Sequence, residues 1–252
     1  MKLKLVTFNI RIQSAKDFSV RLPGIVEKIK NSDADVICFQ ELSCDMKSVL
    51  APLLPDYIIV GGGRNSDRLG EGVPIAYKKD RFVVSELRTR WLSDTPYVPS
   101  SRFNGDQSGC PRVYVYACLT DVNEGITFRV YNTHFDHVGK DARFKEAQMI
   151  LDAVREDFDN YPYPSVLTGD LNATPDTPEI RMIVESGLFI DVTDHFDQTF
   201  NNFGGHVEEF ETKIDYIFIS EEILCTQTEL WDDTFNGNYL SDHFAIAADL
   251  EL

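Results

Sequence analysis

The sequence contains few cysteines, and their spacing suits neither a disulfide framework nor a zinc site. Five cysteines are spread over 252 residues without any C-x-x-C pair, so both of these small-domain architectures are disfavoured. No apolar run is long enough to span a bilayer, and residues 1–10 lack the basic start and apolar centre of a signal peptide. The expectation is a cytoplasmic protein without a transmembrane segment.

The chain is also poor in positive charge. It has 24 Lys and Arg residues against 41 Asp and Glu residues, a net charge of −17. Proteins that grip long nucleic acids usually present a cluster of basic side chains to the phosphates, and the sequence contains no such cluster. A long nucleic acid is therefore disfavoured as a partner, although an acidic surface can still surround a local site for phosphate. The sequence does not indicate the oligomeric state.

What the chain does contain is an alternation of strand-like and helical apolar patterns. The patterns predict strands at 3–10, 36–40, 57–60, 73–77, 82–87, 113–119, 126–132, 165–168, 213–219, 223–231 and 244–250, and helices around 22–29, 46–53, 144–158 and 178–187. The last helix has Thr177 as a predicted N-cap and Gly187 as its stop. Many strands with interleaved helices predict two sheets packed face to face with helices outside, as one domain over 1–252.

Some segments lack periodicity. The loop from Ser93 to Pro111 is long for a compact domain, and such loops are usually functional or mobile. We expect it to shape a pocket. The Gly-rich run from Gly61 to Arg64 lacks the spacing of a phosphate-cradling loop, so no chemistry is assigned to it. The acidic pair Glu208 and Glu209 is expected on an exposed face.

Several apolar strands end in polar side chains that a strand does not need. These residues are Asn9, Glu41, His134, Asp170, Asn172, Asp215, Asp242 and His243. Burying a carboxylate or imidazole there is unfavourable unless the group is paired or ligates a metal. If the strands gather in two sheets, their ends can converge on one edge. The sequence therefore predicts a single site assembled from the whole length of the chain.

The residue types in this set suit phosphate-ester chemistry. Asn9, Glu41 and Asp242 offer the amide and carboxylate oxygens that Mg²⁺ or Mn²⁺ prefers. Such an ion would polarise a phosphoryl oxygen. His243 oriented by Asp215 is the expected pair for taking a proton from water.

The segments that carry these residues resemble the motifs of a known superfamily. They are Thr7-Phe8-Asn9-Ile10, Phe39-Gln40-Glu41, Asn132-Thr133-His134, Gly169-Asp170-Leu171-Asn172, Lys213-Ile214-Asp215-Tyr216 and Ser241-Asp242-His243. In this order they resemble the six motifs of the endonuclease/exonuclease/phosphatase superfamily, which has the DNase I-like fold. Each motif alone is short enough to arise by chance, but the ordered set is specific. Trp91–Pro96, Arg112 and His134–His137 further resemble a compact bacterial branch described only as metal-dependent hydrolases.

The resemblance implies a four-layer α/β sandwich, with two packed mixed β-sheets flanked by helices. It implies attack of a metal-aligned water on phosphorus. Glu41 would be the principal metal ligand, with Asn9 and Asp242 near the same or a second ion.

Other roles follow from the same resemblance. Asp170 and Asn172 would orient the nucleophile or contact the scissile phosphate, and His134 would hold that phosphate. The family divides the general-base role between Asp170 and His243. Arg112 resembles a phosphate-contacting position, and for His137 a surface role and a substrate contact both stay open.

These inferences predict a Mg²⁺- or Mn²⁺-dependent phosphoesterase, acting first on a small or short phosphodiester. A phosphomonoesterase on a sugar or lipid headgroup is the alternative, because the same site serves either ester, and a nuclease ranks third. A catalytically silent binding module on the same fold is disfavoured, since Glu41, Asp170 and His243 are all present. The substrate and the number of metal ions stay open.

Overall fold

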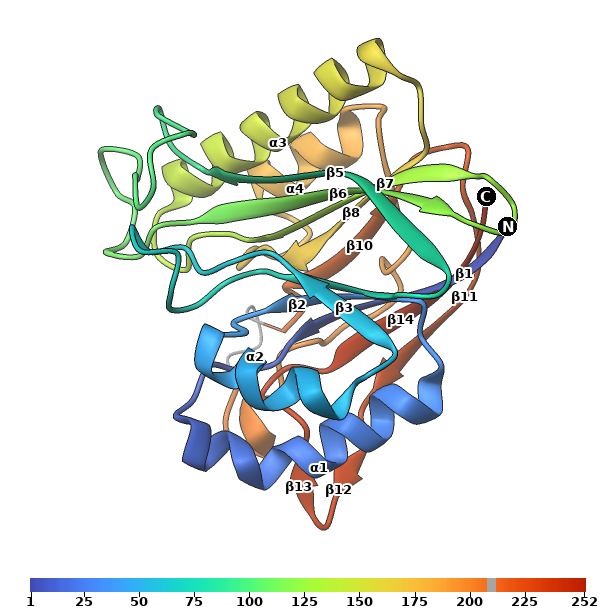
Figure 1. Ribbon diagram of the computed structural model, residues 1–252. Coiled ribbons are helices and arrows are strands. Elements are labelled where there is room, and N and C mark those ends of the chain that lie inside the picture. The colour runs from blue at the N-terminus through green and yellow to red at the C-terminus, as the bar shows by residue number, and fades with distance from the viewer. Residues whose placement is uncertain (208–211) are drawn as a thin grey trace.

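The fold is built from two six-stranded sheets packed face to face (Figure 1). The computed structural model describes residues 1–207 and 212–252, so the predicted exposed pair Glu208 and Glu209 lies outside the described residues. The first sheet has the order β11 (Leu224–Trp231), β14 (Ala245–Glu251), β1 (Lys2–Asn9), β2 (Val36–Gln40), β4 (Ile75–Lys78) and β3 (Tyr57–Val60). The second has the order β5 (Phe82–Trp91), β6 (Val113–Asp121), β7 (Thr127–His134), β8 (Ser165–Asp170), β10 (Asp215–Ile219) and β9 (Ile190–Asp191).

Helices cover the outer face of each sheet (Figure 1). The first sheet is covered by α1 (Ala15–Ser32) and α2 (Cys44–Leu50), which a 3₁₀ turn (Ala51–Leu53) extends; the second is covered by α3 (Lys140–Asn160) and α4 (Pro178–Glu185). A short hairpin, β12 (Thr234–Phe235) and β13 (Asn238–Tyr239), and a 3₁₀ turn (Asn202–Gly204) complete the elements. The four layers confirm the predicted fold class.

Inner strands such as β1 are buried on both faces. Leu3 and Leu5 point into the core between the sheets, whereas Val6 and Phe8 point into the core under the helices. This alternation follows from the two-residue period of a strand. Each fully buried aliphatic side chain of this kind stabilises the fold by about 1.5–3 kcal/mol.

The topology explains why the polar strand ends meet. β1 and β2 form a parallel pair connected through α1, and β7 and β8 form a second parallel pair connected through α3. The carboxyl ends of parallel strands lie at the same edge, and the register places His134 beside Asp170. β10 runs antiparallel to β8, so its first residue, Asp215, pairs with Asp170. β14 runs antiparallel to β1 and likewise begins near Asn9.

Two apolar residues of α3 are exposed, although the apolar pattern of the predicted helix includes them. Phe144 and Phe158, the apolar residues at the two ends of the predicted helix 144–158, are 44% and 42% exposed. The buried positions near the two ends of the helix belong instead to Arg143 and Asp157. Arg143 pairs with Glu179, and Asp157 accepts two hydrogen bonds from an arginine of β5. Pairing makes burial of these charges tolerable.

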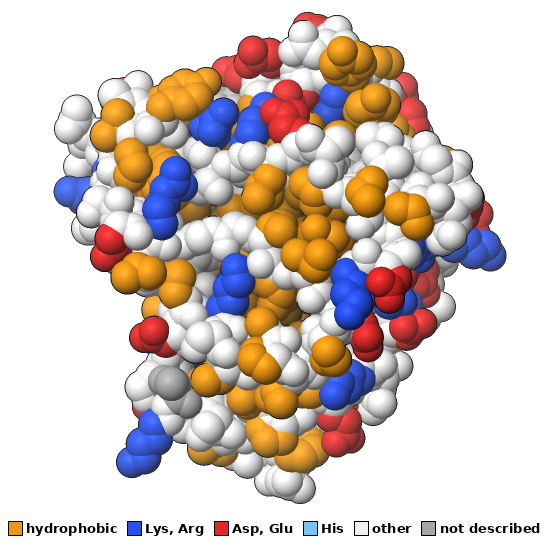
Figure 2. Space-filling model, in the orientation of Figure 1, with side chains coloured by type: hydrophobic (Ala, Val, Ile, Leu, Met, Phe, Trp, Pro, Cys, Tyr) orange, Lys and Arg blue, Asp and Glu red, His pale blue; other side chains and the backbone are white. Residues whose placement is uncertain are grey.

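The face of the molecule that Figure 2 shows has no continuous basic area. Figure 2 shows Lys and Arg side chains lying singly or beside acidic ones around a central apolar area. Among residues 1–207 and 212–252, no helix has the length and apolar character needed to cross a bilayer.

Candidate active site

The predicted polar strand ends come together at one pocket of about 450 Å³. Its lining is Arg11, Ile12, Glu41, Arg64, Glu71, Cys110, Arg112, His134, His137, Asp170, Asn172, Phe200, Ile214 and His243. Six of the nine candidate residues are in this lining. The other three, Asn9, Asp215 and Asp242, are buried beside it.

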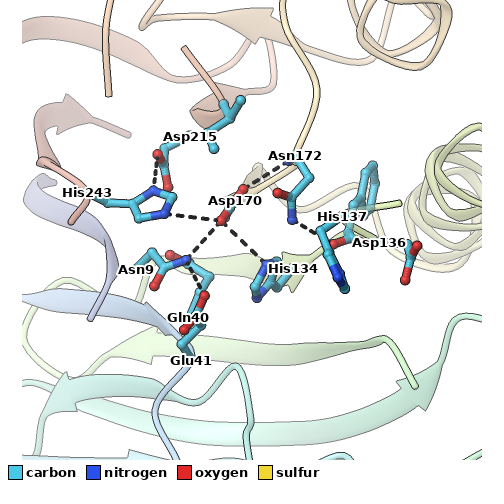
Figure 3. A network of polar contacts seen from close by, with 12 residues as sticks. Asn9, Gln40, Glu41, His134, Asp136, His137, Asp170, Asn172, Asp215 and His243 are labelled. Atoms are coloured by element: carbon cyan, nitrogen blue, oxygen red, sulfur yellow. Dashed lines mark hydrogen bonds and ion pairs between the residues drawn. The ribbon is translucent and has the colours of Figure 1, made fainter. Parts of the chain in front are cut away.

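A chain of polar contacts joins the two sheets behind the pocket (Figure 3). Nδ1 of His243 donates to Oδ2 of Asp215 at 2.9 Å, and Nε2 lies 3.8 Å from Oδ2 of Asp170. The same Asp170 oxygen accepts from Nδ2 of Asn9 at 2.8 Å, and Asn9 also donates to Oε1 of Glu41 at 3.2 Å. The predicted general-base pair is thus in hydrogen-bond contact, and its free nitrogen faces the second carboxylate.

Gly169 permits this arrangement. It has a φ of +153°, and a Cβ at this position would lie 2.2 Å from the carbonyl oxygen of Thr133 on the neighbouring strand. Only glycine tolerates both conditions. The Gly-Asp pair therefore lets β8 approach β7 closely enough for Oδ2 of Asp170 to lie 3.4 Å from Nε2 of His134.

The buried charges are strongly coupled. Burial lowers the pKa of His243, but the nearby carboxylates of Asp215 and Asp170 outweigh that effect and raise it to about 10. Burial acts to raise the pKa of Asp170, but the charges of His134 and His243 lower it. Asp170 is therefore an anion at neutral pH, with an imidazole on either side.

Glu41 is held by the chain that follows β1. Its Oε2 accepts from the backbone N–H of Ile12 at 2.7 Å, and its own φ is +60°. Asn9 uses its amide oxygen to accept from the N–H of Arg11 at 3.0 Å, so its amide nitrogen faces Glu41 and Asp170. Asn9 thus acts in this geometry as a brace between two carboxylates.

Asp242 is buried and is not part of the pocket lining. Its carboxylate is 3.4 Å from Nε of Arg11 and accepts from the hydroxyl of Ser241 at 3.2 Å. Burial raises the pKa of Asp242, and the charge of Glu41 acts in the same direction. The two carboxylates repel each other, and a cation between or beside them would relieve the repulsion.

The donor set fits a hard divalent cation. Glu41 and Asp170 present carboxylate oxygens to the pocket, and Mg²⁺ typically takes one or two carboxylates while keeping waters and substrate phosphate oxygens. Asp170, Asp215 and His243 each place one potential ligand atom within 4.8 Å of the others. Because His243 and Asp215 already bond each other, Asp170 is the member of this group best placed to face a cation.

The pocket lining also contains basic side chains, and the sequence did not predict all of them. We call Arg64, Arg112, His134 and His137 the basic wall. Glu71 braces it, because Oε1 lies 2.5 Å from Nη1 of Arg64 and 3.4 Å from Nδ1 of His134. Burial acts to raise the pKa of Glu71, but His134 and the two arginines bring it to about 2. Arg64 belongs to the Gly-rich run to which no chemistry was assigned, and Glu71 had only its two flanking glycines as a signal.

Arg112 has one guanidinium nitrogen, Nη1, without a hydrogen-bond partner among the described residues. It is 3% exposed, and its Nη2 donates to Nδ1 of His137 at 2.8 Å. Because Nδ1 of His137 accepts, the proton of the neutral ring is on Nε2. Burial and the charge of Arg112 lower the pKa of His137. Both side chains therefore offer N–H donors to an anion.

Asp136 attaches the 93–111 loop to the basic wall. Its carboxylate accepts from the N–H of Ser108 at 3.0 Å and from the N–H of Gly139 at 2.8 Å, and it lies 3.5 Å from Nε of Arg112. Asn172 is fixed in a comparable way: its N–H donates to Asp170 at 2.9 Å and its side-chain amide donates to Phe135.

Known proteins resemble the chain over its full length. The family described as "Endonuclease/Exonuclease/phosphatase family" matches residues 6–243. The endonuclease/exonuclease/phosphatase of Bacteroides vulgatus is 30% identical, with a TM-score of 0.90 over 100% of this chain and 99% of that one. The mannosyl-6-phosphatase of Bacteroides thetaiotaomicron VPI-5482 is 26% identical, with a TM-score of 0.89 over 99% of this chain and 100% of that one.

A protein of Acanthamoeba polyphaga mimivirus, described as uncharacterized, is 26% identical over 135 residues. That match spans 51% of this chain and 50% of the viral protein. The family match and the Bacteroides structures cover both sheets and every candidate residue, which confirms the resemblance seen in the six motifs. The chain belongs to the endonuclease/exonuclease/phosphatase family, whose members act as hydrolases on phosphate esters.

Proposed function

We propose that this protein is a divalent-metal-dependent phosphoesterase that hydrolyses a small phosphate ester by attack of water on phosphorus. The observation that carries the proposal is that one pocket is lined both by potential cation ligands and by basic side chains. Glu41 and Asp170 offer carboxylate oxygens, and the residues of the basic wall offer N–H donors. Phosphoryl transfer needs both an oxygen-rich site for a cation and donors that hold the phosphate.

Glu41 would be the principal ligand of Mg²⁺ or Mn²⁺, with Asp170 as a second carboxylate. Asn9 and Asp242 stay predicted near the same or a second ion; in this geometry Asn9 braces the ligands. When bound, the ion would polarise a phosphoryl oxygen and offset the charge that develops on it. The ligands proposed for the ion are carboxylates, and carboxylate oxygens suit these hard cations.

Binding of a divalent cation to Glu41 and Asp170 would lower the pKa of His243 from about 10, because it would offset the carboxylate charge that raises that pKa. The neutral ring would then take the proton of the attacking water at Nε2, while Asp215 holds the ring through Nδ1 and fixes its tautomer. His134 and Arg112 would donate to non-bridging phosphate oxygens. Asn172 would keep Asp170 in place through its backbone N–H.

The basic wall favours a phosphomonoester over the diester that ranked first from sequence. A monoester carries about −1.5 to −2 charge at pH 7 and three acceptor oxygens. Arg64, Arg112 and His137 supply donors suited to that extra charge, and Nη1 of Arg112 has no hydrogen-bond partner among the described residues. The similar chain named mannosyl-6-phosphatase supports the same choice.

A substrate panel tests the proposal. Purified protein with Mg²⁺ or Mn²⁺, and with a chelator as the control, is assayed against hexose 6-phosphates, mono- and bis-nitrophenyl phosphate, a lipid phosphodiester and a single-stranded oligonucleotide. We expect metal-dependent turnover that is fastest on the monoesters. Preference for the oligonucleotide would favour the nuclease alternative, and binding without turnover across the panel would favour a silent module.

Glu41→Ala and His243→Ala should each abolish turnover while the circular dichroism spectrum stays unchanged. Turnover retained in either variant would refute the assigned role. A single domain over 1–252 and a cytoplasmic location stay predictions of the sequence.

A further inference from the structure

Arg21 of α1 makes an unusual set of contacts behind the cation side of the pocket. It is 6% exposed, and its guanidinium makes five hydrogen bonds. Nη1 donates to the carbonyl oxygens of Ile10 at 2.9 Å and Leu240 at 2.5 Å, and Nη2 donates to that of Arg11 at 3.0 Å. Nε and Nη2 share the side-chain oxygen of Gln13. One side chain therefore joins the segment after β1 to the segment before β14.

Both segments carry site residues. The N–H of Arg11 holds the side chain of Asn9, and the N–H of Ile12 holds Oε2 of Glu41. Leu240 directly precedes Ser241-Asp242-His243. Arg21 itself lines no part of the pocket. Its contacts are with the backbone that aims the candidate ligands and the candidate base.

Only an arginine satisfies this geometry. Its planar fork presents five N–H donors in fixed directions, whereas lysine offers one flexible ammonium group. The plane is also fixed by two rings, with Phe18 and Phe203 at 5.5 and 5.7 Å from the guanidinium carbon. A lysine would keep the charge and lose most of the bonds to the two segments.

We propose that Arg21 is a positioning residue that locks the segments 10–13 and 240–243 together, so that Glu41 and His243 face the pocket in register. The inference rests on the proposed function, because it assigns Glu41 to the cation. Residues that hold metal ligands typically change metal affinity or activity by about 10–100-fold when they are replaced. Arg21 acts one step further out, through backbone rather than through a ligand side chain.

Arg129 provides a matched control. It is 3% exposed and likewise donates to three backbone carbonyls, those of Asp157, Tyr161 and Tyr163. It lies five residues before His134 on β7, roughly 16 Å along the strand from the pocket. Arg129→Lys therefore removes the same kind of contact without touching the site.

The test compares Arg21→Lys with Arg129→Lys in the full chain. Metal-free protein is examined by hydrogen–deuterium exchange of the amides in 10–13 and 240–243, and Mn²⁺ affinity is measured without substrate by electron paramagnetic resonance. We expect Arg21→Lys to raise exchange at both segments and to weaken Mn²⁺ binding about tenfold or more. Arg129→Lys should lower the melting temperature comparably and leave both readouts unchanged.

The outcomes separate this inference from the proposed function. Unchanged exchange at 10–13 and 240–243 in Arg21→Lys, with Mn²⁺ affinity equal to wild type, overturns the positioning role even if the enzyme is an active phosphoesterase. The same holds if Arg129→Lys weakens Mn²⁺ binding equally, since loss of stability would then explain both results. A wild type that binds no divalent cation refutes the proposed function, and the exchange data still decide whether Arg21 locks the segments.

Discussion

Glu146 gives a prediction in which stability, pH and the site are connected. It lies on α3, fully buried; Oε2 accepts from the N–H of Asp136 at 2.9 Å and Oε1 has no hydrogen-bond partner among the described residues. Burial raises its pKa to about 8, although the bond from Asp136 and the charges of Arg112 and Arg143 act in the other direction. Its ionisation beneath the basic wall therefore carries a large cost.

The sign of the pH effect follows from which state binds the proton more tightly. The ordinary pKa is 4.5, so between that value and about 8 the folded protein holds a proton that the unfolded chain has lost. The contribution of protonated Glu146 to the free energy of unfolding is fully present below pH 4.5. It decreases as the pH rises from 4.5 and is lost once the pH has passed about 8. The slope is about 1.4 kcal/mol per pH unit, or on the order of 4 kcal/mol by pH 8.

Glu146→Gln removes the ionisation and keeps an oxygen that can accept from Asp136. We expect the variant to match the wild type near pH 4.5 and to exceed its free energy of unfolding at pH 8 by on the order of 4 kcal/mol. Turnover at neutral pH should be retained. The measurement is urea unfolding at several pH values between 4.5 and 8.5.

Glu156→Gln is the matched control, because Glu156 lies on an exposed face of the same helix. It should leave the pH dependence unchanged. Parallel stability curves for wild type and Glu146→Gln would refute the reasoning, as would a variant that is less stable than the wild type at pH 8.

Three further substitutions probe the chemistry. Asp215→Asn should reduce kcat about 10²–10⁴-fold with little change in KM, because His243 loses the partner that fixes its tautomer; steady-state kinetics would show the opposite if Asp215 served only binding. Glu41→Gln should raise the Mg²⁺ concentration for half-maximal turnover at least about tenfold, because a carboxylate ligand is removed; equal Mg²⁺ dependence would contradict the ligand role. Arg112→Lys should raise KM for a monoester about 10–100-fold, the loss expected for charge-assisted hydrogen bonds, and a smaller effect on the monoester than on a diester would contradict the monoester preference.

Much of the fold could be predicted because periodicity and strand ends are local properties. The strands 36–40 and 57–60 have the predicted bounds, β5 runs further than predicted, and β7 begins one residue later and ends two residues later than predicted. The position of Thr177 at the start of α4 is confirmed, but its hydroxyl donates to the carbonyl oxygen of Thr174 rather than capping the helix. The short strands β9, β12 and β13 carry too few residues for any pattern.

The carboxylate residues of the site could also be predicted from a local pattern. Asp170 and Glu41 end apolar strands, so their polarity contrasts with their neighbours. In the basic wall, His134 gave the same contrast, whereas Arg64 did not. Arg64 and Glu71 lie in the loop between β3 and β4, where charged residues are ordinary. The bridge between Gly63 and Gly72 and the hydrogen bond from the N–H of Arg64 to the carbonyl oxygen of Glu71 at 2.8 Å bring their backbones together. A contact between two residues of one loop produces no periodic pattern in the sequence.

The net charge of −17 and a site for phosphate are compatible because they act over different distances. Exposed acidic groups are screened beyond about 8 Å at physiological ionic strength, and they mainly slow the approach of an anion. Arg112 is 3% exposed, so its interaction with a bound phosphate is screened far less. Long polyanions depend on many screened surface contacts, whereas a small phosphate ester depends on a few buried ones. The same balance makes a salt test informative: KM for a small monoester should change little between 50 and 200 mM salt, roughly less than twofold, whereas binding to many phosphates falls steeply.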